Sequence, residues 1–200
     1  MPLPNIKNEP RLRKCTYPEA QNFWKYLLAI MMYIWGCANP TSSYTPSEKE
    51  KLCNEVIRVA AKEIYNKTGL IPFGSGGGAM DQIRMLALSF HCRHEVDITE
   101  GRKLLIAALE TFMTVINKDE RIRTYLINYP FEPKNIEIEI FIQNEDGSSV
   151  ALDSLCILGA VDGILDYQIH TPDGLWLETV HEETYEEALE KLQEKAAVCL

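Results

Sequence analysis

Basic side chains are scarce at the C-terminal end of this 200-residue chain. Residues 135–200 contain two lysines against 15 carboxylates, whereas residues 1–46 are net positive and residues 47–134 are close to neutral. The formal charge of −9 therefore arises in the last third. This deficit excludes a protein that binds nucleic acid regardless of sequence, because such proteins present a basic face. The acidic third is expected either to meet a basic protein partner or to act as a solvated face.

The six cysteines have none of the spacings that mark metal sites or disulfide frameworks. No two of them are separated by two residues, so a structural zinc site is not predicted, and no metal or other cofactor is expected. His91, Cys92 and His94 are metal-ligand types that lie close together in the sequence. At this spacing on a strand, however, the two histidines point to opposite faces. We therefore interpret these three as ordinary residues at the end of a strand.

No apolar run in the N-terminal region is long enough to cross a bilayer as a helix. Residues 26–35 are uninterrupted apolar residues. At about 1.5 Å per residue this run reaches at most ~18 Å, against a hydrocarbon core of ~30 Å. Its length, and the net positive stretch before it, are typical of a signal peptide. The alternative is an N-terminal helix that packs into the core of a cytoplasmic protein.

The residues after this run, Ile34, Trp35, Gly36 and Cys37, resemble the lipobox of bacterial lipoproteins. That motif has an aliphatic residue three positions before the cysteine and a small residue just before it; Trp35 is bulkier than its usual counterpart. The resemblance implies cleavage before Cys37, attachment of lipid to Cys37, and a protein anchored in the cell envelope that faces the periplasm or the exterior.

This interpretation divides the chain into four segments. They are a basic leader (1–25), a signal-like apolar segment ending in the lipobox-like Cys37 (26–37), a small, polar, proline-containing linker (38–46) and a single α+β domain (47–200).

Capping residues and apolar periodicity predict three helices in the domain. Each begins at one of three pairs: Ser47 with Glu50, Asp97 with Glu100, and Thr184 with Glu187. Strict alternation predicts a strand over 135–142, and further strands are expected within 82–93, within 161–170 and over 175–180, the last two as a hairpin. We expect an α+β fold of order α-β-α-β-β-β-α. In it, an antiparallel sheet of about four strands packs with two to three helices on one face.

The first candidate site is the cluster Gly74, Ser75, Gly76, Gly77 and Gly78. Its backbone N–H groups could cradle an anion or form an oxyanion hole, which would make the protein a hydrolase or a nucleotide-using enzyme. The dinucleotide fingerprint is not met, because Pro72 interrupts the preceding strand, and no lysine follows for a phosphate loop. The alternative is a flexible connection or a tight turn.

Two further polar clusters stand out. Arg121, Arg123 and Tyr125 could bind a carboxylate or phosphate, or could tie their loop to the acidic C-terminal third, which we prefer. Asp162, Asp166 and His170 share one face at four-residue spacing; they suit acid–base chemistry or a solvent-facing row. No catalytic residue is assigned.

The chain from Leu70 through Phe141 resembles a group of uncharacterised lipoprotein-like proteins of chlamydia-type bacteria. The motifs that carry the resemblance are residues 74–81, 116–117, 122–126 and 128–131. It implies export and supplies no catalytic residues. We therefore predict a membrane-anchored envelope lipoprotein that is a binding or structural module rather than an enzyme.

Overall fold

The computed structural model describes residues 45–198; the basic leader, the apolar segment, Cys37 and nearly all of the linker lie outside the described residues. The elements follow one another as α2 (Glu48–Thr68), β1 (Ile71–Gly78), β2 (Met85–Cys92), α3 (Ile98–Lys118), the short 3-10 turns η1 (Arg123–Tyr125) and η2 (Pro133–Asn135), β3 (Ile136–Ile142), β4 (Leu155–Val161), β5 (Ile164–His170), β6 (Leu177–Thr184) and α4 (Tyr185–Val198).

The strands form one mixed sheet whose spatial order, β1 to β6, is also the order of the chain. Neighbouring strands pair antiparallel except β2 and β3, which are parallel. A parallel pair needs a crossover, and α3 lies in the connection between these two strands. The register aligns one residue of every strand in a single row: Gly74, Ser89, Glu139, Gly159, Asp166 and Glu182.

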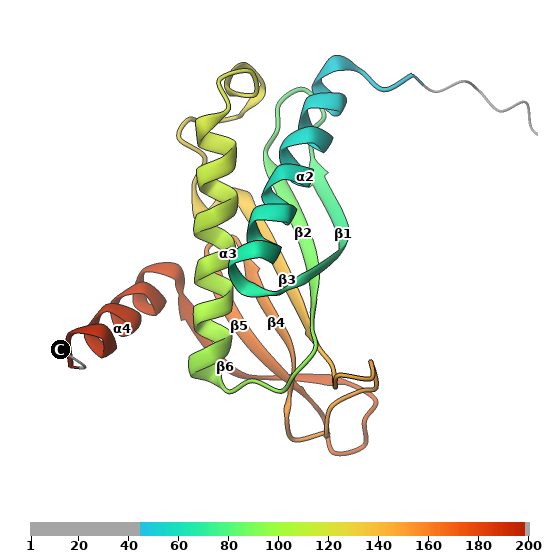
Figure 1. The fold of residues 1–200 in the computed structure, drawn as a ribbon, viewed down its shortest axis with the longest axis vertical. Coiled ribbons are helices and arrows are strands. Elements are labelled where there is room, and N and C mark those ends of the chain that lie inside the picture. The colour runs from blue at the N-terminus through green and yellow to red at the C-terminus, as the bar shows by residue number, and fades with distance from the viewer. Residues whose placement is uncertain (1–44, 199–200) are drawn as a thin grey trace, which may run out of the picture. The chain divides into compact units, whose positions relative to one another are not determined.

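All three described helices belong to one side of the sheet. Figure 1 shows α2 and α3 next to each other in front of the strands, and α4 contacts α3, β5 and β6. Residues of β2 and β3 alternate between buried and half-buried, with Phe90 and Ile140 among the fully buried ones. Gly101 allows α3 to approach the sheet closely, because a Cβ there would lie 3.1 Å from Leu158. No described helix covers the other side, which we call the open face.

The three predicted helix starts are confirmed. The capping contacts join Ser47 with Glu50, Asp97 with Glu100, and Thr184 with Glu187. Gly69, in the left-handed conformation at φ 78°, ends α2. These side chains satisfy backbone N–H groups that lack partners within the helix, which explains why they mark its first turn so reliably.

The α+β class is confirmed, but the sheet is larger than predicted and is mixed rather than antiparallel. The observed order is α-β-β-α-β-β-β-β-α. The two strands that the prediction omits are β1, which contains Pro72 and four glycines, and β4. Such residues weaken a central strand but are tolerated at an edge, which is the position of β1.

Candidate functional site

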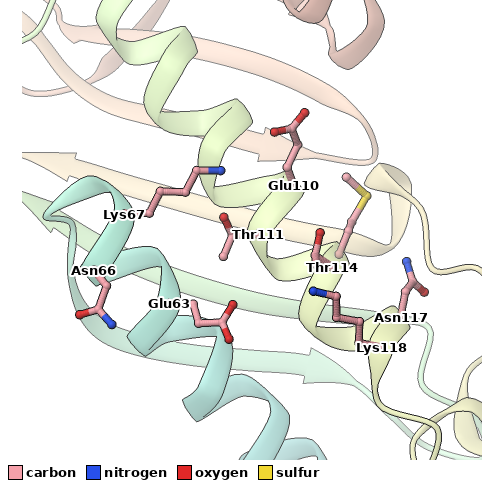
Figure 2. Close-up of a pocket in the computed structure, with 9 residues that line it drawn as sticks. Glu63, Asn66, Lys67, Glu110, Thr111, Thr114, Asn117 and Lys118 are labelled. Carbon is pink, nitrogen blue, oxygen red and sulfur yellow. The ribbon is translucent and has the colours of Figure 1, made fainter.

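A groove of about 920 Å³ lies between α2 and α3. Figure 2 shows its lining, which comes from the C-terminal half of each helix: Glu63, Asn66 and Lys67 from α2, and Glu110, Thr111, Met113, Thr114, Asn117 and Lys118 from α3. The lining holds two lysines and two glutamates. Because these charges balance, the groove has no preference for an anion or for a cation.

Some polar groups in this groove already have structural partners. The side-chain amide of Asn117 donates to the carbonyl of Phe131 at 3.0 Å, and its oxygen accepts from the Phe131 N–H at 2.7 Å. The Thr111 hydroxyl donates to the carbonyl of Ala107 one turn earlier. Asn117 thus fastens the loop before β3 to α3.

A buried carboxylate, Glu183 on β6, accepts three side-chain hydrogen bonds. Its Oε1 accepts from Arg102 Nε at 2.6 Å and from the Tyr167 hydroxyl at 2.7 Å, and its Oε2 accepts from Lys191 Nζ at 2.7 Å. The ring of His181 packs against Tyr167 with 5.3 Å between centroids. The network joins α3, β5, β6 and α4.

The charge state of this network follows from its contacts. Burial would raise the pKa of Glu183, but the hydrogen bonds from Arg102, Lys191 and Tyr167 outweigh it and lower that pKa to about 2. Burial and the hydrogen bond to Glu183 raise the pKa of Tyr167. Glu183 is 3% exposed and Tyr167 is fully buried, so substrate cannot reach either. We assign the network a structural role.

One cluster has the arrangement of a catalytic thiol, its base and the carboxylate that orients the base: Cys92, His94 and Glu100. Cys92 Sγ lies 3.6 Å from His94 Nδ1, and His94 Nε2 lies 3.1 Å from Glu100 Oε1. The thiol is nevertheless only 2% exposed, and burial raises its pKa. A reactive cysteine needs an accessible thiolate, so this one is not a nucleophile. His91 lies on the open face instead, where it stacks on Phe73 at 4.1 Å.

The glycine cluster 74–78 lies in β1, the edge strand paired with β2. None of these residues has a positive φ, so the segment is extended and is neither the loop nor the tight turn that the composition suggested. Gly74 and Ser75 line a small hollow of about 280 Å³ together with Asn54 and Arg58 of α2. The anion site at this segment stays a prediction.

The arginine cluster is tied internally, although not to the acidic C-terminal third. Arg121 forms ion pairs with Asp119 at 2.6 Å and with Glu55 of α2 at 3.2 Å. Arg123 lies over the ring of Tyr129, with its guanidinium carbon 4.6 Å from the centroid. Tyr125 packs against the core from η1. The three residues do not converge on one ligand-sized space, so they do not form a joint site.

The strands carry charge of one sign. No lysine or arginine occurs in β1 to β6, whereas β3, β5 and β6 contain six carboxylates. Four of these belong to the open face by the strand alternation and register: Glu137, Glu139, Asp166 and Glu182. Among the described residues 135–194, every ion pair within 4 Å converges on Glu183. The four carboxylates of the open face therefore have no cationic partner in the described part of the chain.

The carboxylates of the open face repel one another electrostatically. Partial burial and the neighbouring charges of Glu137 and Asp166 raise the pKa of Glu139, against a hydrogen bond from Ser89 that lowers it. The open face also carries a row of aromatic side chains, in which Phe73 contacts His91 and Phe141. Of the row predicted from four-residue spacing, Asp166 and His170 share this face by the strand alternation of β5, whereas Asp162 forms the β4–β5 turn. A cation placed here would relieve the repulsion between the carboxylates.

Comparisons with protein-family models, with curated proteins and with solved structures found no match for this chain. Among residues 45–198, no group of three or more His, Cys, Asp or Glu side chains is arranged to hold a metal ion. No helix in that range combines the length and apolar character needed to cross a bilayer. Of the surfaces described above, the open face has the clearest chemical preference.

Proposed function

We propose that this protein is a lipid-anchored envelope module that binds a basic protein partner through the acidic open face of its sheet, and that it is not an enzyme. The observation that carries the proposal is the uncovered sheet face with four carboxylates and no lysine or arginine on any strand. Complementary charge steers a partner to such a surface and selects against acidic ones.

The anchoring part of the proposal rests on the sequence around Cys37. A short apolar run and a small residue directly precede this cysteine, and a polar linker of nine residues separates it from the domain. A linker of this length would hold the domain near the membrane while leaving it free to turn toward a partner. The enzyme alternative is not adopted, because Gly74–Gly78 lie in an extended edge strand.

The binding proposal is tested with a ten-residue lysine peptide and a ten-residue glutamate peptide, titrated into the full chain. We expect the lysine peptide alone to bind, and more weakly as salt is added. The triple variant Glu137→Gln, Glu139→Gln and Asp166→Asn should lose roughly tenfold in affinity, since each of these half-buried charges remains accessible to solvent and contributes about 0.5–1 kcal/mol.

A matched control removes three exposed carboxylates on the helix side: Glu63→Gln, Glu190→Gln and Glu194→Gln. It changes the net charge by the same amount and should bind nearly as the parent does. Equal weakening in both variants would show that total charge, and not the open face, attracts the peptide.

The anchor is tested by feeding cells a labelled fatty acid and comparing the parent with Cys37→Ala. We expect label in the parent and none in the variant. Label that persists in the variant contradicts attachment at Cys37.

A further inference from the structure

The sheet has two outer edges, and neither pairs with another strand in the part of the chain that the structure describes. An unpaired edge presents backbone N–H and C=O groups, and proteins usually protect such edges with proline, lysine, bulges or a covering element. The edge of β1 is protected in this way, because Pro72 lacks an N–H and the pairing is irregular at Phe73.

The edge of β6 has neither proline nor lysine. All residues from Leu177 to Val180 are exposed along it. One bulge interrupts its pairing with β5 between Tyr167 and Gln168, leaving the remainder in regular antiparallel register. The edge at β6 is thus the more open of the two for another strand.

A cluster of exposed apolar side chains lies at the start of this edge. Leu175 is 75% exposed and Trp176 is 72% exposed at the tip of the β5–β6 hairpin. Leu177 and Val180 follow on the strand, and Leu152 comes within 3.4 Å of where a Cβ on Gly174 would be. We call Leu152, Leu175, Trp176, Leu177 and Val180 the apolar tip. Exposed apolar clusters that include tryptophan are characteristic of binding sites.

The negative charge on β6, next to the apolar tip, indicates which kind of segment could pair with this edge. Glu178 and Glu182 are exposed on β6. Pairing of two copies through this edge would bring these carboxylates alongside those of the second copy, which is destabilising. A segment with lysine or arginine at the matching positions would pair them instead. The complementary chemistry is therefore an extended segment with apolar residues at one end and basic residues along it.

We infer that β6 accepts an extended, basic and apolar segment of another protein as a seventh strand. The segment adds its backbone to the edge and its apolar end covers the apolar tip. Its basic side chains meet Glu178 on one face of the sheet and Glu182 on the other, because the bulge in β6 places these two carboxylates on opposite faces. This inference goes beyond the proposed function, because it concerns the backbone edge of the sheet and the apolar tip, and it shares only Glu182 with the open face.

The test uses a synthetic ten-residue peptide in which pairs of lysines alternate with pairs of valines, so that both faces carry lysine, with two leucines at one end. A second peptide has the same side chains but a methyl group on every peptide nitrogen. With the full chain, we expect the first peptide to slow amide hydrogen exchange in residues 175–184 at least tenfold. The methylated peptide cannot donate backbone hydrogen bonds and should give no such protection. Equal protection by both peptides overturns the inference.

Two variants separate this site from the open face. Glu178→Gln, which does not change the open face, should weaken the first peptide several-fold, and Trp176→Ala should do the same. The control Glu190→Gln with Glu194→Gln should not change it. If both edge variants bind the first peptide as the parent does, the inference of a seventh strand is wrong. It is also wrong if the chain forms a dimer without peptide and the Trp176→Ala variant is a monomer, because the edge would then bind a second copy. In either case the open-face proposal would still hold if the triple variant that includes Glu139→Gln weakens binding of the ten-residue lysine peptide.

Discussion

Gly159 and Asp166 face each other across the β4–β5 pair, and the carboxylate of Asp166 occupies the space that a side chain on Gly159 would need. Glu139 lies on the other side of Gly159 in the same row. The missing side chain therefore gives two carboxylates access to one stretch of the open face. It explains why a glycine is placed in a strand that is otherwise apolar.

Replacing Gly159 by alanine should push the Asp166 carboxylate out of its position. We expect a loss of about 1–2 kcal/mol in the free energy of unfolding, because the strand must accommodate a close contact. Urea unfolding followed by circular dichroism measures it. The combination Gly159→Ala with Asp166→Ala removes the clash and should recover much of the loss. Equal stability of both variants would contradict the proposed contact.

The network around Glu183 predicts acid sensitivity. The folded-state pKa of about 2 lies below the ordinary 4.5 of a glutamate. The resulting stabilisation, about 3 kcal/mol, is present above pH ~5 and is lost as the pH falls from ~4.5 toward ~2. Glu183→Gln should therefore flatten the dependence of unfolding free energy on pH in this window. Glu190→Gln, an exposed change on α4, serves as the control. A parent and Glu183→Gln with parallel curves would contradict the assignment.

The groove between α2 and α3 contains a matched pair of asparagines. Asn117 makes two hydrogen bonds to the backbone of Phe131, whereas Asn66 is an exposed residue on α2. We expect Asn117→Ala to cost about 2 kcal/mol of stability, since two backbone groups lose their partner. Asn66→Ala should cost less than about 0.5 kcal/mol. Thermal unfolding of both variants checks the difference, and similar losses at the two positions would argue against the Asn117 contacts.

The cysteines in the described part of the chain, Cys53, Cys92 and Cys156, are free and buried, and burial raises the pKa of each. We expect a maleimide reagent to label these positions slowly in the folded chain and rapidly in denaturant. Peptide mass spectrometry resolves the sites one by one. Complete labelling of Cys92 within the first minute under native conditions would contradict its placement in the core.

Local signals predicted the helices well and the sheet less completely. The caps at Ser47, Asp97 and Thr184 are short-range features, so they identify helix starts without knowledge of the fold. The predicted strand within 161–170 ran through Asp162 and Gly163, although both have positive φ, at 51° and 78°, and form the β4–β5 turn. An aspartate–glycine pair between apolar runs is a hairpin signal, and with it β4 could have been found.

The remaining differences depend on contacts between distant residues. β1 reads as a loop from composition, and only its pairing with β2 makes it a strand. The ion pair of Arg102 with Glu183 joins residues 81 positions apart, and no local pattern announces it. The sequence predicted the strand over 135–142 and a solvent-facing row that includes Asp166, but bringing Glu139, Asp166 and Glu182 into one row needs the register of four strands, β3 to β6.

The strands have the same order in the sheet as in the chain, so the sheet can be assembled strand by strand from the N-terminal end. A chain delivered from its N-terminus, by the ribosome or through a translocation channel, presents each strand after the one with which it pairs. In that order β1 and β2 are available to pair first, α3 is delivered before β3, and β4 to β6 then follow in turn. Glu183 arrives on the last strand and Lys191 on the helix after it. The charged contacts of Glu183 therefore close only after β6 and the first half of α4 have emerged.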